Sequence, residues 1–380
     1  MGKVDLLIKN GRVLDTAAGI DDIGCIAVHE GKSLGLVSGN TAANKIINAS
    51  GCFVLPGLID FHTHLDVQNS SMAVDPNFLL PLGVTTAADA GTSGSGNFHD
   101  FYNNVIAKSK VTVCTFLNVS ANGQPGGGIN EDFDPEHFSL PEIKDLVDEY
   151  PGQIRGLKIR MESAIMGQWG LAPLIRAKEI STQLGLPLVV HAANPPAPEA
   201  ELLAILGSGD ILCHCYHGKN EHTILDDQGK VRPEVWAARE RGVLFDMANG
   251  VTNYNHDVAI SALADGFLPD IVSSDLCDVV FNNDGYGKSL PYTMSKMLCL
   301  GMSIREVVRA TTEIPAVMLG LEGKAGTLAE SAWGDITILK AVENTPIFLD
   351  NFGKGITGNT LLVPQMTIKS GNILFRQCDF

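Results

Sequence analysis

The stretch from Pro56 to His64, PGLIDFHTH, constrains the fold of this chain more than any other. The apolar run Phe53-Val54-Leu55 leads into it and predicts a buried strand. Because side chains alternate between the two faces of a strand, His62 and His64 are expected to point the same way. Two imidazoles side by side at the end of a buried strand are typical ligands of a divalent metal such as zinc. We therefore predict a metal site here, rather than histidines that are only part of the core.

The chain from about residue 56 to about residue 323 alternates apolar strands with helical stretches, which is typical of a parallel sheet built from βα repeats. After the first strand, the others are expected at residues 82–89, 110–118, 154–160, 186–192, 210–216, 242–246 and 270–275. Eight such strands predict an α/β fold of the (β/α)8 TIM-barrel type. The catalytic groups of such a barrel lie at the C-terminal ends of its strands.

Both ends of the chain are expected to form short strands without intervening helices. The pair Asn10-Gly11 predicts a hairpin turn between strands at 5–9 and 12–14. Near the other end, strands are expected at 335–339, 360–363 and 365–369. We predict that residues 1–55 and 324–380 form one small β-sandwich domain beside the barrel at residues 56–323. The alternative is two separate flaps.

Other candidate ligands fall where a barrel would place them. His191 and Asp275 end predicted strands, and His214 lies within another. Lys158 lies inside the apolar strand Leu157-Lys158-Ile159. A strand-end aspartate often caps the next helix, and a strand lysine often reaches water, so each residue alone is weak evidence. Their joint position at the ends of several strands indicates a functional site. His217 competes with His214, which we prefer because it directly follows the apolar part of its strand.

Arg160 suggests the chemistry of the substrate. It lies two residues after Lys158 and therefore points to the same face, into the mouth of the barrel. A guanidinium there suits a substrate carboxylate, which it can bind with two hydrogen bonds. The alternative is an ion pair with Glu162 or another nearby acid. Asn249 and Tyr254, in the loop after the seventh strand, are also expected to shape the pocket, unless that loop is an ordinary turn.

Composition excludes some classes of partner. The chain carries 27 basic and 43 acidic residues, for a net charge of −16. A surface this acidic argues against nucleic acid and against anionic membranes as partners. Its 8 cysteines form no CxxC pair and are expected to be reduced thiols. With neither a signal peptide nor a membrane span recognised, we expect a soluble cytoplasmic protein.

The PGLIDFHTH string, the strand-end ligands and the string GLKIRM at residues 156–161 resemble the amidohydrolase superfamily, and most closely its amidohydrolase/deacetylase subgroup. The resemblance implies a binuclear centre. One divalent metal would be bound by His62, His64 and Asp275, and the other by His191 and His214. Lys158, carbamylated by CO2, would bridge them as a carboxylate does. Zinc is the expected metal, with manganese and iron as alternatives, and Asp275 is expected to transfer the proton as general base and then acid.

The same resemblance implies a hydrolase that removes an acyl group from a small α-substituted carboxylate, either an acylated hydroxy acid or an acylated amino acid. Alternatives are a cyclic amidase of the dihydroorotase or hydantoinase type and an adenine-type deaminase. Asp66 stands where the dihydroorotases of this superfamily carry an arginine, which argues against that activity. A third alternative is a non-catalytic barrel, against which the full set of ligands argues. Exposed barrel helices also favour a homo-oligomer.

Overall fold

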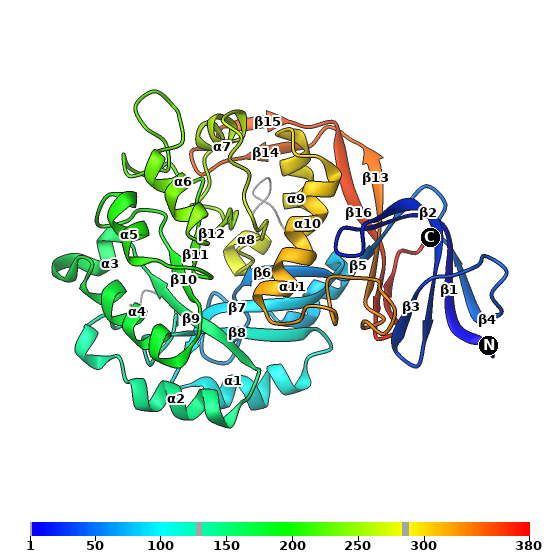
Figure 1. Cartoon of the computed structure of the whole chain (residues 1–380), viewed down its shortest axis with the longest axis horizontal. Helices are drawn as coiled ribbons and strands as arrows, with labels where there is room; N and C mark the ends of the chain where they lie inside the picture. The colour runs from blue at the N-terminus through cyan, green and yellow to red at the C-terminus, as the bar shows by residue number, and fades with distance from the viewer. Residues whose placement is uncertain (1, 127–130, 283–288) are drawn as a thin grey trace.

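The computed structural model describes residues 2–126, 131–282 and 289–380, and its larger part is a curled parallel sheet surrounded by helices (Figure 1). The sheet has seven strands in the order β12-β11-β10-β9-β8-β7-β6, all parallel. The strands are β6 (Leu58–Thr63), β7 (Val84–Gly94), β8 (Thr112–Asn118), β9 (Ile154–Arg160), β10 (Leu188–His191), β11 (Ile211–Cys213) and β12 (Leu244–Asp246). The prediction of an α/β barrel-type fold is confirmed.

The eighth predicted strand is present as an irregular segment that closes the barrel. Single parallel bridges join Asp246 to Ile271 on one side and Thr63 to Leu276 on the other. A regular ladder is interrupted because Asp275 has φ +54, a backbone conformation that no strand adopts. Side chains replace the missing ladder bonds, since Asp60 accepts hydrogen bonds from the backbone N–H of Ser274 at 3.0 Å and from its hydroxyl at 2.5 Å.

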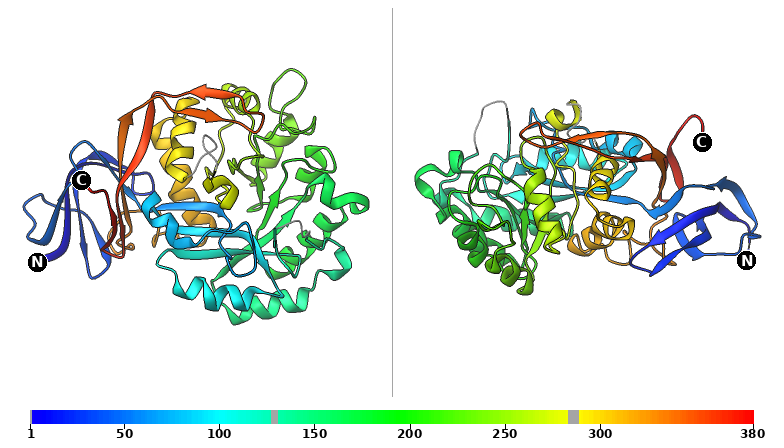
Figure 2. Two further views of the ribbon diagram at one scale, coloured as in Figure 1. Left: turned by 180° about the vertical axis from the view of Figure 1, so that it is seen from behind. Right: turned by 90° about the horizontal axis from the view of Figure 1, so that it is seen from above.

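Helices cover the outside of this sheet (Figure 2). They are α1 (Phe98–Asn104), α2 (Leu140–Glu149), α3 (Ser163–Met166), α4 (Ala172–Leu184), α5 (Glu199–Ile205), α6 (Pro233–Glu240), α7 (His256–Ala264), α8 (Asp278–Asn282), α9 (Leu290–Cys299), α10 (Ile304–Thr311) and α11 (Glu313–Met318). Within the described residues, no helix combines the length and the apolar character that crossing a membrane requires. All 8 cysteines are unpaired.

The two chain ends pair into one mixed sheet, as predicted. Its order is β17-β16-β13-β5-β1-β2-β3, and β4 pairs with β1. The strands are β1 (Val4–Asp15), β2 (Ile20–His29), β3 (Lys32–Leu36), β4 (Ala43–Asn48), β5 (Phe53–Pro56), β13 (Ile336–Glu343), β16 (Thr360–Lys369) and β17 (Asn372–Arg376). The run at 53–55 belongs to this sheet, where β5 pairs with β1 and β13. The buried strand predicted at 53–55 is therefore present as β5, and the strand that carries His62 begins separately at Leu58.

The predicted hairpin at Asn10-Gly11 is wrong. Strand β1 runs through these residues, and its register against β2 shifts between Ile8 and Gly11, which marks a bulge. Asn10 adopts φ +64 there. Asparagine tolerates this left-handed backbone conformation, which occurs in turns and here occurs in a bulge. A Cβ at Gly11 would lie 2.5 Å from Val54 Cγ2, and glycine therefore allows the close approach of β5.

A two-stranded arm connects the composite sheet with the barrel. Strands β14 (Ile347–Leu349) and β15 (Gly355–Thr357) lie between β13 and β16 in sequence and reach across to α7 and α9 (Figure 1). The arm hydrogen-bonds the loop that follows β12, because the Asn351 N–H donates to the carbonyl of Tyr254 at 2.9 Å. His256 Nε2 also lies 2.9 Å from the carbonyl of Phe348. The loop is therefore supported by a segment distant in sequence.

Candidate metal centre

The C-terminal end of β6 brings two imidazoles to one carboxylate. His64 Nε2 lies 3.2 Å from Asp275 Oδ1, and His62 Nε2 lies 3.6 Å from the same oxygen. Thr63 points away between them, and its hydroxyl donates to the carbonyl of Ala88. The alternation of side chains predicted for this strand is thus present. The three side chains are close enough to hold one metal ion.

The other predicted ligands join the same cluster. His191 is the last residue of β10 and His214 directly follows β11, and their ring centroids lie 4.2 Å apart. The ring of His214 is 5.2 Å from that of His62. Lys158 Nζ lies 3.2 Å from His62 Nε2, and the lysine is 2% exposed. The structure therefore brings together all six side chains that the sequence nominated as ligands.

Each of the four imidazoles has an outer partner on one ring nitrogen. Nδ1 of His64 lies 3.1 Å from Thr92 Oγ1, and Nδ1 of His214 lies 2.8 Å from the carbonyl of Ala248. The remaining two partners are carboxylates: Glu162 Oε1 lies 2.9 Å from His191 Nε2, and Asp246 Oδ2 lies 3.5 Å from His62 Nδ1, an ion-pair contact that does not meet hydrogen-bond geometry.

Such outer partners fix the orientation and the tautomer of metal-binding histidines. They leave Nε2 of His62, His64 and His214 and Nδ1 of His191 as the nitrogens for a metal. His214 Nε2 is buried and has no hydrogen-bond partner among the residues that the structure describes. An orphaned buried acceptor of this kind is costly unless something binds it, so the donor set fits a divalent cation.

Burial also puts these imidazoles in the protonation state that a metal requires. It lowers the pKa of His62, and it lowers the pKa of His191 and His214 even further, with help from neighbouring positive groups. Neutral imidazole has a lone pair to donate, whereas imidazolium has none.

Asp275 is held from two sides. Its Oδ1 faces His62 and His64, and its Oδ2 accepts a hydrogen bond from Asn253 Nδ2 at 3.2 Å. Burial alone would raise the pKa of Asp275, but the hydrogen bond from His64 and the nearby rings of His62 and His214 outweigh it and lower that pKa. The carboxylate is therefore ionised and fixed in orientation.

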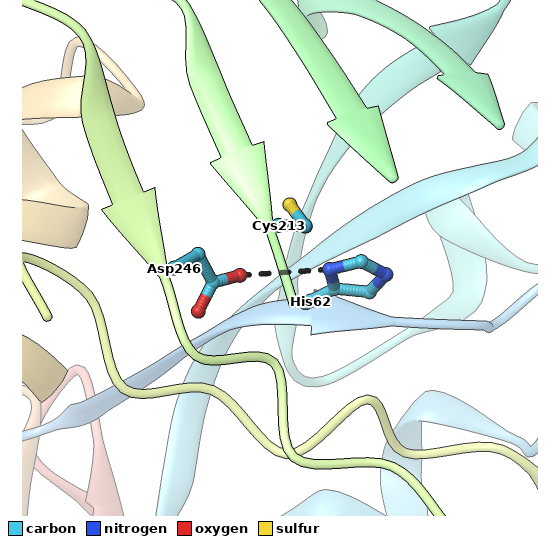
Figure 3. A group of neighbouring side chains, drawn as sticks. All are labelled: His62, Cys213 and Asp246. Carbon is cyan, nitrogen blue, oxygen red and sulfur yellow. Dashed lines mark ion pairs between the residues drawn. The ribbon is translucent and has the colours of Figure 1, made fainter. Parts of the chain in front are cut away.

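A second group close enough to hold a metal surrounds the opposite nitrogen of His62. It consists of His62, Cys213 and Asp246, all fully buried, and Figure 3 shows Asp246 facing the imidazole with Cys213 beside them. Asp246 already accepts hydrogen bonds from the Ser273 hydroxyl and from the Ala248 N–H. Burial raises the pKa of Cys213 well above its usual value, which disfavours the thiolate that binds metals. We therefore assign Asp246 to the support of His62.

The cluster opens into a cavity of about 400 Å³. The members of the cluster that line it are His64, His191 and Asp275. Apolar side chains such as Met72 and Val280 line it together with the charged Arg160 and Lys219. A small molecule with one apolar and one charged part would suit such a lining.

Arg160 both lines this cavity and forms an ion pair. Its Nη2 and Nε lie 2.6 Å and 2.8 Å from Oε2 of Glu131, while Glu162 binds His191 and Lys219 instead. Burial raises the pKa of Glu131, an effect that the charge of Arg160 opposes. The Arg160 side chain is 24% exposed and lines the cavity, so Glu131 does not bury it completely.

The two loop residues expected to contact the substrate lie elsewhere. Asn249 and Tyr254 are buried around Lys296, whose Nζ donates to Asn249 Oδ1 at 2.7 Å and lies 4.2 Å from the centroid of the Tyr254 ring. Burial lowers the pKa of Lys296 to about 7. Neither residue is part of the cavity lining within the described residues, whereas Val251 and Asn253 of the same loop are.

His217 and Asp66 are buried outside the lining of the described cavity. His217 Nε2 lies 3.7 Å from Glu199 Oε2, and both side chains are buried. Asp66 accepts hydrogen bonds from the side-chain amide of Asn69, and burial raises its pKa to about 6. The structure thus brings His214, and not His217, into the cluster.

Sequence reasoning missed the residues that support the ligands, Arg160 and the loop after β12. Asp246 ends a predicted strand just as Asp275 does, and the same strand-end rule could have nominated it. The sequence suggests Glu162 only as a rival partner of Arg160. Thr92, Glu131 and Lys296 give no local signal, because their partners lie far away in sequence.

Gly91 makes room for Lys158, which gives a testable prediction. A Cβ at Gly91 would lie 2.5 Å from Lys158 Cγ, and φ there is +82. Gly91→Ala should displace the lysine and lower metal content, measured by atomic emission on folded protein. Gly185→Ala is the matched control, because Gly185 has φ +66 but no atom of the described part of the chain within 4 Å of the added carbon. Both variants should lose about 1 kcal/mol of stability to backbone strain. Equal metal content in the two variants would contradict the prediction.

Three comparisons with known proteins agree on the type of fold. The sequence profile of the amidohydrolase family matches residues 53–373. A deacetylase of Enterococcus faecalis is 31% identical over 374 residues, which cover 97% of this chain and 98% of the relative. A deacetylase of Agrobacterium fabrum is 34% identical over 283 residues, covering 74% and 69%. A crystal structure of an adenine deaminase superposes with a TM-score of 0.91 at 30% identity, covering 99% of this chain and 100% of that one.

Proposed function

This chain belongs to the amidohydrolase family of hydrolases, and we propose that it is a binuclear metal-dependent deacetylase of small α-substituted carboxylates. Water would accept the acyl group, and the product released would be a hydroxy or an amino acid. Two relatives named deacetylases match most of the chain and support the reaction type. The position of Arg160 at the cavity that also exposes Asp275 and His64 is the observation that carries the substrate class.

The donor set supports two cation positions. His62, His64 and Asp275 would hold one ion, and the free nitrogens of His191 and His214 the other. Carbamylation of the Lys158 amine, which lies 3.2 Å from His62 Nε2, would supply a carboxylate to bridge them. Nitrogen and oxygen ligands of this kind favour zinc, with manganese and iron as alternatives.

Two divalent cations held there would lower the pKa of a water molecule between them and polarise the acyl carbonyl. Asp275 would accept the proton of that water at Oδ2, the oxygen on the side of Asn253, and later return it to the leaving oxygen or nitrogen. The outer partners Glu162, Asp246 and Thr92 would keep the imidazoles in place during the reaction. Arg160 would hold the carboxylate of the substrate at the cavity wall.

The test measures metal content and hydrolysis together, on protein purified without chelator. The substrates are N-acetyl and O-acetyl α-substituted carboxylates, cyclic imides and adenine. About two metal ions per chain together with turnover of the acetyl carboxylates would support the proposal. Turnover confined to a cyclic imide would overturn the proposed substrate class. Absence of both metal and turnover would overturn the proposal of a metal-dependent hydrolase.

A second candidate is deamination of adenine, which the close superposition on the crystal structure of an adenine deaminase favours. Adenine is neutral and has no carboxylate for Arg160 to bind. Turnover of adenine that is insensitive to the Arg160 substitution would establish this second function.

Replacement of Arg160 should separate charged from neutral substrates. In Arg160→Met, we expect KM for acetyl carboxylates to rise about 100-fold, because a charge-assisted bidentate contact is lost. KM for the corresponding neutral esters should change less than about 3-fold. Arg176→Met is the control, since it breaks the exposed pair of Arg176 with Glu179 on α4. An equal rise for charged and neutral substrates would remove Arg160 as the anchor.

A further inference from the structure

We infer that Glu131 is the positioning residue that sets the specificity of this site for carboxylates, because it fixes Arg160 in the orientation that a substrate requires. The inference rests on the proposed function. Glu131 comes from the loop after β8, whereas Arg160 ends β9. Its side chain is 1% exposed and is no part of the described cavity lining, so it acts through Arg160 and not on the substrate directly.

Among the described residues, the contacts of Glu131 occupy one edge of the Arg160 guanidinium and leave the other edge free. A guanidinium has a side edge, formed by Nε and Nη2, and an end edge, formed by Nη1 and Nη2, and each can bind a carboxylate with two hydrogen bonds. Glu131 Oε2 occupies the side edge, at 2.8 Å from Nε and 2.6 Å from Nη2. The end edge is therefore the one left for a substrate carboxylate in the cavity.

Glu131 is itself fixed by its second oxygen. Oε1 accepts a hydrogen bond from Asn118 Nδ2 at 3.2 Å. Asn118 also donates to the carbonyl of Gly91 at 3.0 Å and accepts from the N–H of Ser120 at 2.9 Å. Asn118 pairs with Lys158 in the register of β8 and β9. The guanidinium is thus tied to the same strand ends that carry the proposed metal ligands.

Two roles of Glu131 predict opposite effects on substrate binding. If its negative charge mattered most, removing it would increase the net positive charge of the pocket and strengthen the binding of an anion. If positioning matters most, removing it frees the long arginine side chain, and binding weakens because that freedom must be lost again. The direct contacts to both oxygens of Glu131 favour positioning.

The test compares Glu131→Gln and Glu131→Asp on an N-acetyl amino acid and its primary amide. Gln keeps the size and loses the charge, while Asp keeps the charge and is too short to reach both Asn118 and Arg160. We expect KM for the carboxylate to rise about 10-fold in both variants, with kcat and the KM of the amide changed less than about 2-fold. A lower KM for the carboxylate in Glu131→Gln, or wild-type behaviour of Glu131→Asp, would overturn the inference.

The matched control is Glu179→Gln, which makes the same change in the exposed ion pair with Arg176 on α4. It should leave both KM values unchanged. A double substitution, Glu131→Gln with Arg160→Met, should bind the carboxylate no worse than Arg160→Met alone if Glu131 acts only through the arginine. An additional loss in the double variant would contradict that role.

Crystal structures of the wild-type protein and of Glu131→Gln provide a measurement that needs no substrate. The Arg160 guanidinium should be ordered toward the cavity in the first and displaced or present in several conformers in the second. An unchanged guanidinium would overturn the inference. If the wild-type protein hydrolyses none of the acetyl carboxylates, the proposed function fails, and the two crystal structures still decide the role of Glu131.

Discussion

Lys158→Ala is expected to reduce the metal content from about two ions per chain to one or none and to lower turnover by on the order of 1000-fold. The reason is that Lys158 Nζ lies 3.2 Å from His62 Nε2, where its carbamate would link the two groups of histidines. Without the bridge, the remaining ligands of each ion are too few and are separated. Metal content is measured by atomic emission after extensive dialysis.

Lys296→Ala is the matched control for metal content. Lys296 is as buried as Lys158, at 1% and 2% exposure, but its Nζ contacts Asn249 and the carbonyl of Leu349 and none of the proposed ligands. This variant should retain both ions. The carbamate can be observed directly by carbon-13 NMR after equilibration with labelled bicarbonate, and its signal should disappear in Lys158→Ala. Two fully occupied sites in Lys158→Ala would refute the bridge.

Asp275→Asn is expected to lower kcat by about 100-fold to 10000-fold, the range that general acid–base catalysis contributes. The amide keeps the shape of the carboxylate and its contact with Asn253, but it cannot accept the proton. The variant should still bind metal, because the four imidazoles and Lys158 remain. The measurement is kcat on the best acetyl carboxylate, together with metal content.

Asp148→Asn is the control for this substitution, since Asp148 pairs with Lys144 on the exposed surface of α2. Its kcat should equal that of the wild-type protein. A wild-type kcat in Asp275→Asn would remove the proton-transfer role. A low kcat accompanied by complete loss of metal would show instead that Asp275 acts as a ligand alone.

The six candidate ligands could be predicted from sequence because the period of a strand and the common edge of a parallel sheet fix where such side chains meet. His62, His191 and Asp275 could be predicted without knowing how any loop folds, because they lie in or at the end of predicted strands. The eighth strand was located correctly in sequence, but its irregular backbone depends on Asp60 and Asp246, which replace ladder bonds. A hydrophobic pattern does not predict that side chains replace backbone hydrogen bonds.

Other features depend on contacts between distant segments. The pair Asn10-Gly11 has the local chemistry of a turn, yet strand pairing with β2 and the close approach of Val54 make it a bulge. The alternative to a substrate contact for Arg160 was an ion pair with Glu162 or another nearby acid, whereas the structure pairs Arg160 with Glu131, which precedes it by 29 residues. Local propensity cannot rank such partners, because the loop that carries Glu131 is placed by the whole barrel.

The arm formed by β14 and β15 has a consequence for how this protein is made on the ribosome. Translation releases the ligands in order, and the last of them, Asp275, emerges well before Asn351, which supports the loop that includes Tyr254. Strand β5 likewise cannot pair with β13 until that later strand has been synthesised. A nascent chain would therefore carry every proposed ligand while its loop lacked support, so the binding site would mature only as the last part of the chain is synthesised.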